Sequence, residues 1–265
     1  MVREAELDAI AELVEPFRQF LDPYCEGIEG IPRQGPALFV GNHTLGGVFD
    51  APIMYLELWR QRRIYPRALG HYIHFMIPIW RDWLERYGVV EGTRANCSRL
   101  MKEGHHVLVF PGGGREVAKR RGEKYQLIWK ERTGFARMAI EHRCPIVPFS
   151  AVGVEDALDI VFDANDFHAS AVGEWLRSMG LSLPDELLIP IFKGIGITPI
   201  PRPERLYFRF AEPIDTNEYA DRGDIESASR QLRDRVRAIV EEGIGHLQTI
   251  QEADPKRNRL EAAPD

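Results

Sequence analysis

The sequence predicts an α/β fold, a single layered domain in which helices flank a largely parallel or mixed central sheet. Short apolar runs that suit buried strands alternate with longer segments of helical periodicity, and no internal repeat divides the 265 residues. With 44% hydrophobic and 28% charged residues, a chain of this length can bury a full core without disulfides. We expect an N-terminal amphipathic helix and linker over residues 1–34, the main domain over 35–252, and a flexible tail over 253–265.

The first segment has the periodicity of an amphipathic helix. Its apolar residues recur at steps of three and four, and Asp22-Pro23 is expected to end the helix. Two locations suit such a helix, packed on the core or lying on a membrane, although its polar face is acidic and anionic headgroups would repel it. The apolar positions are Leu7, Ile10, Val14, Phe17 and Leu21.

The later elements follow from short apolar runs and from two longer periodic segments. Pro148 lies inside one predicted strand, which favours an edge strand or a bulge there. An aromatic-rich stretch over residues 72–83 suits either core packing or an acyl-binding or membrane-facing surface. The predicted strands are 37–40, 68–69, 89–90, 107–110, 146–151 and 206–210, and the predicted helices are 51–60, 133–142 and a long C-terminal helix at 225–251.

Charge and cysteine content exclude several classes of protein. The 34 basic and 40 acidic residues give a net charge of −6, which argues against nucleic acid as the main partner. Three separated cysteines fit a reducing compartment and make no zinc-binding pattern. No stretch resembles a signal-peptide core or a membrane span of about 18 apolar residues. We therefore expect a cytoplasmic protein, with the inner face of a membrane as an alternative position.

His43 is the first candidate catalytic residue. It follows the predicted strand at 37–40 directly, and open α/β sheets bind ligands at the carboxyl ends of their strands. Histidine is the usual general base near neutral pH, and Asp50 is a candidate to orient its ring. A continuous helix from His43 to Asp50 would separate them by about 10.5 Å. We therefore predict an irregular segment at residues 44–48 and a helix beginning near Asp50 or Ala51. The alternative is a structural histidine.

A glycine-rich loop is the second candidate. Gly112, Gly113 and Gly114 follow the predicted strand at 107–110, and such a loop lets backbone N–H groups approach an anion or oxyanion. The next residue, Arg115, carries a planar cation suited to phosphate or carboxylate. The alternative is a plain glycine turn. A basic cluster over residues 119–124 suits either a solvated surface or contact with coenzyme A phosphates or lipid headgroups.

Taken in order, four segments resemble the motifs of the glycerolipid acyltransferase superfamily, which includes glycerol-phosphate and lysophosphatidate acyltransferases. The segment at 124–137 and the PGG-x-RE pattern are closer to the branch of diacylglycerol- and monoacylglycerol-type acyltransferases and plant phytyl ester synthases. The matching residues are Asn42, His43 and Asp50 in the first motif; Gly88 and Arg94, with five residues between them, in the second; FPGGGR at 110–115, where FPEGTR is usual, in the third; and PIVP at 145–148 in the fourth.

The resemblance implies an O-acyltransferase that moves a fatty acyl group from a thioester to a lipid alcohol. It implies that His43 is the general base, that Asp50 orients it, and that Arg94, Arg115 and the three glycines bind substrate. The donor would be acyl-CoA or an acyl carrier protein thioester, with no cofactor or metal, and contact with the membrane would be peripheral. The rival functions are a non-catalytic lipid-binding module on the same fold and an esterase or thioesterase that uses water.

Two departures from the family pattern bear on this interpretation. Six residues separate His43 from Asp50 where four are usual, which changes the geometry expected of the pair. Gly112 replaces the usual glutamate and Gly114 the usual threonine. In the family this glutamate and the arginine help to hold a glycerol phosphate, so the second departure argues against a phosphorylated acceptor.

Overall fold

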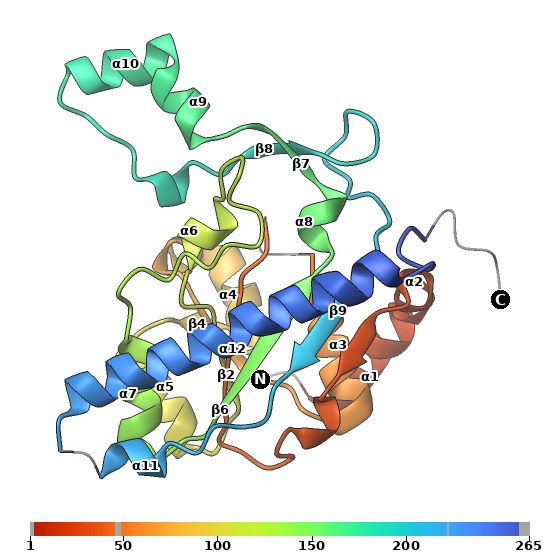
Figure 1. Ribbon diagram of the computed structural model, residues 1–265, viewed down its shortest axis with the longest axis vertical. Helices are drawn as coiled ribbons and strands as arrows, with labels where there is room; N and C mark the ends of the chain where they lie inside the picture. Colours follow the sequence, from red (N-terminus) through yellow and green to blue (C-terminus); the bar gives the residue numbers. More distant parts are fainter. Residues whose placement is uncertain (1–2, 46–48, 222, 260–265) are drawn as a thin grey trace.

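A computed structural model of the chain describes residues 3–45, 49–221 and 223–259. Its core is a seven-stranded sheet in the order β1-β9-β6-β2-β5-β3-β4 (Figure 1). Every neighbouring pair is parallel except β6 and β9, so the predicted α/β domain with a largely parallel, mixed sheet is confirmed. The strands are β1 (Tyr24–Glu26), β2 (Leu38–Gly41), β3 (Arg67–Gly70), β4 (Val90–Glu91), β5 (Val107–Val109), β6 (Ile146–Val152) and β9 (Tyr207–Phe210).

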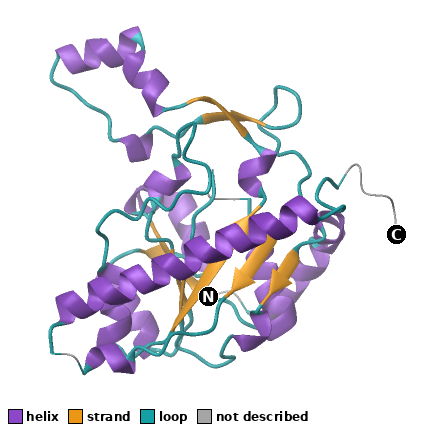
Figure 2. Cartoon of the chain, viewed as in Figure 1, coloured by secondary structure: helices purple, strands orange, loops and turns teal. Residues whose placement is uncertain are grey.

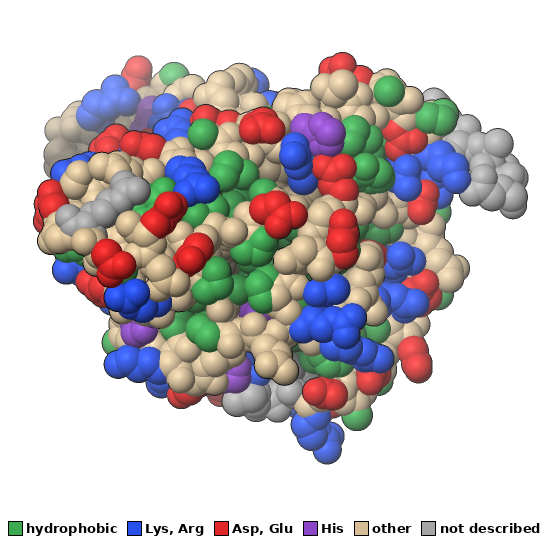
Figure 3. Space-filling view, turned by 60° about the horizontal axis from the view of Figure 1, so that its bottom comes forward, with side chains coloured by type: hydrophobic (Ala, Val, Ile, Leu, Met, Phe, Trp, Pro, Cys, Tyr) green, Lys and Arg blue, Asp and Glu red, His purple; other side chains and the backbone are tan. Residues whose placement is uncertain are grey.

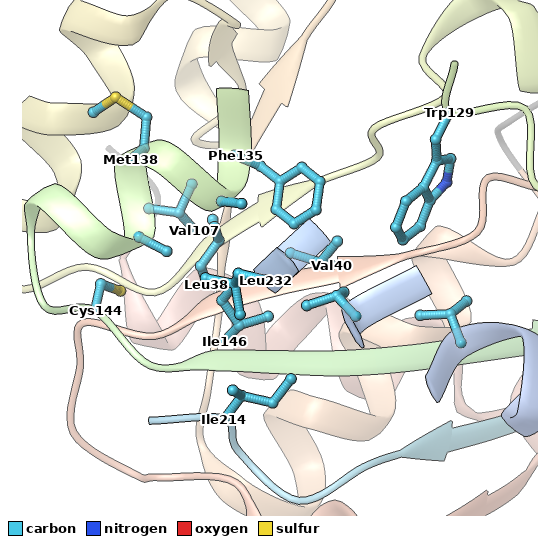
Figure 4. Packing of buried hydrophobic residues seen from close by; sticks show 14 of the residues in the cluster. Leu38, Val40, Val107, Trp129, Phe135, Met138, Cys144, Ile146, Ile214 and Leu232 are labelled. Atoms are coloured by element: carbon cyan, nitrogen blue, oxygen red, sulfur yellow. The ribbon is translucent and has the colours of Figure 1, made fainter. Parts of the chain in front are cut away.

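Helices cover both faces of this sheet (Figure 2). Successive strand residues point to opposite faces, so Leu38 and Val40 join one hydrophobic cluster while Ala37 and Phe39 join the other. The first cluster packs under α12, α7 and α5 and contains the residues shown in Figure 4, and the second packs under α3. The helices are α1 (Glu4–Leu13), α2 (Glu15–Leu21), α3 (Ala51–Arg62), α4 (Pro78–Arg86), α5 (Arg94–Lys102), α6 (Gly114–Val117), α7 (Gly134–Glu141), α11 (Asn217–Ala220) and α12 (Ile225–Ala253).

The N-terminal helix is divided in two. The expected continuous helix breaks at Val14, because Pro16 lacks the N–H that an uninterrupted helix would use. Leu7 and Leu21 are buried, whereas Phe17 is 57% exposed. Asp22, in the left-handed conformation, ends α2 as predicted. This segment therefore packs on the body of the protein through only part of its apolar face.

Strand β6 occupies a central place in the sheet. The edge position considered for Pro148 is therefore wrong, because β6 lies between β9 and β2. The structure has the bulge instead. Ile146 pairs with Ile214 and Phe149 with Phe210, so two residues of β6 lie opposite three residues of the segment that follows β9. The missing N–H of Pro148 lies in this irregular stretch, where regular pairing is interrupted.

Residues on both sides of the expected main domain, 35–252, contact its sheet. Strand β1 pairs with β9, so the sheet includes residues that the sequence analysis assigned to a linker. The tail is not frayed at its start: Asp254 accepts hydrogen bonds from the Tyr207 hydroxyl at 2.7 Å and from Arg205 at 2.9 Å. Residues 260–265 lie outside the described residues. Arg259, the last described residue, donates from its Nε to the Phe20 carbonyl at 2.8 Å, so this part of the tail is held against α2.

A long insertion separates β6 from β9, although these strands are antiparallel neighbours. This β6–β9 excursion, residues 153–206, rises above the sheet at the top of Figure 1. Its 3₁₀ turn, η3 (Asp185–Leu187), returns to pack on α6. The other elements of the excursion are α8 (Val154–Ala157), a two-stranded ribbon of β7 (Asp159–Phe162) and β8 (Ile191–Lys193), α9 (Ala164–Ala169) and α10 (Ala171–Ser178).

The aromatic-rich stretch at 72–83 does not pack in the core, so that expectation is wrong. It forms a 3₁₀ turn over Tyr72–Met76 and helix α4, neither of which has a buried residue. Ile79 is 87% exposed and Met76 is 70% exposed, while Trp80 and Trp83 stack on each other at the surface. The stretch is therefore an exposed apolar surface, and the acyl-binding or membrane-facing role expected as the alternative stays a prediction.

The surface away from the excursion has a different character. The face at the bottom of Figure 1 is brought forward in Figure 3, where acidic and basic side chains are interspersed around a few hydrophobic ones. Within the described ranges, no helix is both long and apolar enough to cross a bilayer.

Candidate active site

Three chain segments meet at the carboxyl end of the sheet because β2 lies between β5 and β6, parallel to both. His43 follows β2, the glycine loop follows β5, and α8 follows β6 after Gly153. The sheet thus gathers residues from three distant parts of the sequence at the end where parallel α/β sheets bind ligands.

Asn42 fixes the backbone in front of His43. Its side-chain amide donates to the Ala151 carbonyl at 2.9 Å and accepts from the Ala151 N–H at 2.8 Å. Asn42 is fully buried, so both polar groups of its side chain are satisfied by β6. The residue extends the pairing of β2 and β6 by one step and holds the loop that carries His43.

The His43 imidazole lies on Phe110, the residue that follows β5. The ring centroids are 3.9 Å apart and the planes differ by 10°. His43 as a whole is partly exposed, but its Nδ1 is enclosed and has no hydrogen-bond partner among the described residues. Burial, with the nearby charge of Lys119, lowers the pKa of His43 to about 3. The imidazole is therefore neutral at physiological pH, the form that a general base requires.

Asp50 caps the helix that follows. Its Oδ1 accepts from the Ala51 N–H at 2.8 Å, and α3 begins at Ala51, as predicted. His43 to Leu45 are not helical, and residues 46–48 of the predicted irregular segment lie outside the described residues. Burial raises the pKa of Asp50 to about 6. Within the described residues no hydrogen bond joins Asp50 to His43, so the orienting role of Asp50 stays a prediction.

The glycine loop is folded partly on itself. The Gly113 N–H donates to the Phe110 carbonyl at 3.0 Å, so this group is not available to an oxyanion. Gly113 has φ +53°, a conformation that favours glycine. Arg132 donates to the Pro111 and Gly112 carbonyls at 2.9 and 2.8 Å and to Glu186 of the excursion at 3.0 Å. The loop is therefore tied to the excursion through one guanidinium.

Arg115 is turned inward. It is buried, donates to the Ala118 carbonyl at 3.1 Å, and pairs with Glu123 at 2.5 Å. Its guanidinium closes the loop that follows α6, so binding a substrate anion would require it to leave Glu123. The substrate-binding role of Arg115 stays a prediction, and the structure gives the residue a definite structural role.

Arg94 lies at the edge of the sheet. It is exposed at the start of α5, directly after β4. Strand β4 is three strand spacings from β2, or about 14 Å at roughly 4.8 Å per spacing. The structure therefore places Arg94 at the correct end of the sheet but does not bring it to His43. The Gly88 before it has φ +78° and packs against Arg67.

Two buried acidic residues complete the site, and the sequence analysis did not identify either. Glu116, in α6, is fully buried and accepts a hydrogen bond from the His43 N–H. Glu155, in α8, pairs with Lys119 at 2.6 Å, and both side chains are almost fully buried. The sequence could have indicated Glu116 as the acidic residue directly after the glycine loop and Arg115. No pattern in the sequence indicates Glu155.

A cavity of about 280 Å³ opens beside the loop that carries His43. Leu45, two residues after His43, forms one wall, and the basic segment 119–124 forms another. Arg120 pairs with Asp185, Arg121 with Asp166, and Lys124 with Asp156. The cations of this segment are therefore compensated by carboxylates of the excursion. Among the residues that the structure describes, no group of three or more His, Cys, Asp and Glu side chains is arranged to hold a metal ion.

Comparisons with known proteins match this arrangement. Residues 22–152 match the family model described as Acyltransferase, a span that ends with β6 and includes His43, Asp50 and the glycine loop. The chain is similar to phytyl ester synthases 2 and 1 (chloroplastic) of Arabidopsis thaliana, at 32% and 31% identity over 88% and 89% of this chain. It spans only about a third of those proteins, 35% and 36% of their lengths.

Two further matches concern part of the chain and its fold. A protein of Bos taurus called DGAT1/2-independent enzyme synthesizing storage lipids is 30% identical over 49% of this chain, which covers 38% of that protein. The crystal structure of the 1-acyl-sn-glycerophosphate acyltransferase PlsC from Thermotoga maritima shares the fold, with a TM-score of 0.52 and 17% identity over 89% of this chain and 79% of that one. The expected family resemblance is confirmed: residues 22–152 of the chain match the Acyltransferase family model.

Proposed function

We propose that the protein is an O-acyltransferase that moves a fatty acyl group from a thioester to the hydroxyl of a lipid alcohol, with His43 as the general base. The observation that carries the proposal is the state of His43. Its ring is neutral and stacked on Phe110 at the carboxyl end of β2, and its backbone is held by hydrogen bonds on both sides. The match of residues 22–152 to the Acyltransferase family model supports the same class of reaction, acyl transfer.

The reaction follows from a neutral imidazole at this position. His43 takes the proton of the acceptor hydroxyl while the hydroxyl oxygen attacks the thioester carbonyl carbon, which forms a tetrahedral oxyanion. The intermediate collapses, the carbon–sulfur bond breaks, and the departing sulfur takes up the proton that His43 holds. An ester and a free thiol result, and His43 returns to its neutral form. General-base assistance of this kind contributes about 10²–10⁴-fold to a rate.

The acceptor we propose is a lipid alcohol without a phosphate group. Arg115 is committed to Glu123, and Arg94 lies at the sheet edge. Neither guanidinium is poised beside His43 to hold a phosphate. The relatives named phytyl ester synthases point to a long-chain alcohol such as phytol, and the relative named for storage lipids points to an acylglycerol.

We further propose that the protein meets its substrates at a lipid surface through the exposed apolar side chains of α4 and of the excursion. In the excursion, Trp175 is 59%, Ile189 64% and Ile197 94% exposed. The excursion rises from the end of the sheet that carries α6 and the glycine loop (Figure 1). Flotation with phosphatidylcholine vesicles tests this contact. Protein that stays with the soluble fraction at every lipid composition tried would contradict it.

One assay tests the reaction and separates the alternatives. The protein is incubated with radiolabelled palmitoyl-CoA alone and with phytol, diacylglycerol or lysophosphatidate, and His43→Ala serves as the control. Acyl ester formed with phytol or diacylglycerol, and lost in His43→Ala, is the expected result. Free fatty acid alone would indicate an esterase, and no turnover would indicate a lipid-binding module. Ester formed only with lysophosphatidate would contradict the proposed acceptor class.

A further inference from the structure

Glu116 has an unusual environment for a carboxylate. Its side chain is fully buried, and each of its two oxygens accepts a hydrogen bond from a backbone N–H. Oε2 accepts from His43 at 3.0 Å, and Oε1 accepts from Ile128 at 2.9 Å. One side chain on α6 thus joins the loop that follows β2 to the segment that leads into Trp129.

The chain leaves room for this carboxylate at Gly112. A Cβ atom at position 112 would lie 2.1 Å from Cδ of Glu116, and the three nearest atoms all belong to Glu116. Gly112 does not have a positive φ, so its backbone conformation is open to other residues. Glycine is required here for space, and the space is filled by Glu116.

Burying a carboxylate is costly, and the surroundings offset that cost only in part. Burial raises the pKa of Glu116 to about 7, while the two N–H groups and the nearby charge of Lys119 lower it, and Glu155 raises it. An apolar side chain would fill the same space at lower cost. An apolar side chain, however, would offer no acceptor to the backbone N–H of His43, the proposed general base.

We propose that Glu116 is a positioning residue for His43. The Glu116 carboxylate accepts a hydrogen bond from the His43 N–H, and this keeps the imidazole flat on Phe110 and at a fixed place above the carboxyl end of β2. This inference rests on the proposed function, in which His43 is the base. Asn42 holds the chain on one side of His43 through β6, and Glu116 holds it on the side of β5 and α6.

The pH dependence of the reaction follows from this arrangement. Between pH 5 and 8 the imidazole of His43 does not titrate, because its pKa lies near 3. Glu116 does titrate in that range, and protonation weakens one of its two acceptor oxygens. The groups that face Glu116 are His43, Lys119 and Glu155, and Asp50 has a raised pKa of its own near 6. We expect the acid limb of kcat near pH 7 to belong to Glu116.

Three variants and one control test the role. Glu116→Gln keeps the shape but turns an NH₂ group toward one of the two N–H donors, and Glu116→Ala removes the acceptor. Gly112→Asp combined with Glu116→Ala returns a carboxylate to the same space from the other side. Glu131→Gln is the control, because the Glu131 side chain is 91% exposed and pairs with Arg233 of α12.

We expect kcat of Glu116→Gln and Glu116→Ala to fall about 10- to 100-fold with KM within about twofold, since small misplacements of a catalytic group have effects of this size. The acid limb near pH 7 should disappear in both variants. The double variant should recover at least part of kcat, and Glu131→Gln should match the wild type. A Glu116→Gln protein with wild-type kcat and an unchanged pH profile would overturn the proposal, as would a double variant no better than Glu116→Ala.

A measurement on the unaltered protein covers the case in which the variants do not fold, and it needs no turnover. Protection of the His43 amide against hydrogen exchange, corrected for the intrinsic rate, should fall as the pH is lowered from 8.5 to 5.5, with a midpoint near 7. Constant protection over that range would overturn the proposal. If the wild type transfers no acyl group, the proposed function fails, and the exchange measurement still decides the role of Glu116.

Discussion

The imidazole of His43 lies flat on the ring of Phe110, with the centroids 3.9 Å apart and the planes within 10° of parallel. Phe110 in turn meets Phe149 of β6 edge-on at 5.8 Å, so a row of rings runs from the core to the candidate base. One face of the imidazole is thereby closed to water. This contact fixes the plane in which the ring nitrogens can meet a substrate.

Replacing Phe110 by leucine should loosen His43 without unfolding the protein. Stacked aromatic pairs contribute about 0.5–1.5 kcal/mol beyond the area that they bury. A loss of that size corresponds to about a 2- to 12-fold fall in kcat at about 1.4 kcal/mol per factor of ten. Water that reaches the ring should also raise the pKa of His43, which a histidine NMR titration measures. An unchanged kcat and an unchanged titration would show that the stacking is incidental.

Asp50→Asn separates helix capping from catalysis at this position. Asparagine caps a helix as well as aspartate does, so the melting temperature should hold, whereas Asp50→Ala should lose about 1 kcal/mol of stability. Because Nδ1 of His43 lacks a partner, we expect the Asp50 carboxylate to turn toward it in the substrate complex, and kcat of Asp50→Asn to fall more than about 100-fold. Full activity in Asp50→Asn would leave Asp50 as a helix cap only.

Asp50 should also leave a signature in the pH dependence of stability. Its pKa is raised in the folded state from an ordinary value near 3.8 to about 6, so the folded protein binds more protons than the unfolded chain between those values. The contribution of Asp50 to stability is therefore greatest below about pH 4 and is lost as the pH rises through 6. Urea denaturation of wild type and Asp50→Asn from pH 4 to 7 should show curves that diverge over this interval, with the wild type losing more. Parallel curves would contradict the raised pKa.

Arg115 is expected to act on stability more than on substrate affinity. Its guanidinium pairs with Glu123 and bonds the Ala118 carbonyl, and Arg115→Met should leave Glu123 without that partner. We expect a loss of about 1–3 kcal/mol in chemical denaturation, the usual effect of losing a hydrogen bond to a charged group. KM for both substrates should stay within about twofold. A large rise in KM for one substrate with unchanged stability would assign Arg115 to that substrate, as the family resemblance implies.

The Lys119–Glu155 pair should behave as a coupled unit. Lys119→Met leaves a buried carboxylate unpaired, which costs about 3–5 kcal/mol. In Lys119→Met/Glu155→Gln the amide is neutral and its oxygen still serves the Tyr125 N–H, so most of the loss should be recovered. Urea denaturation of the two single variants and the double variant measures the coupling. Additive losses would show that the two charges do not depend on each other.

The sequence located the site to the extent that local pattern and strand order determine it. His43 and the glycine loop follow apolar runs that do form neighbouring parallel strands, and Ala51-Pro52 does begin a helix. Glu116 was missed because its role depends on the space above Gly112 and on a backbone N–H 73 residues away. The spacing of residues along the chain carries no information on that space or on that backbone contact.

One expectation failed because burial is decided by the whole fold. The aromatic residues at 72–83 have the composition of a core, yet no residue of α4 is buried. Arg115 has the chemistry of an anion-binding residue and pairs with Glu123, eight positions later, so its role in substrate binding stays a prediction. The partners of both groups depend on segments that sequence patterns do not place.

The place where the β6–β9 excursion enters the fold has a consequence for how such proteins can diverge. Adjacent antiparallel strands can be joined by a two-residue turn, and β6 and β9 keep their pairing whatever the length of chain between them. The excursion can therefore change in length or sequence without a change in the seven-stranded sheet. The excursion is bound to the glycine loop through Glu186 and Arg132. A different segment at this place would therefore bring its own apolar surface to the same end of the sheet. Under the function proposed above, a change in the excursion would alter the contact with lipid while His43 stays in place.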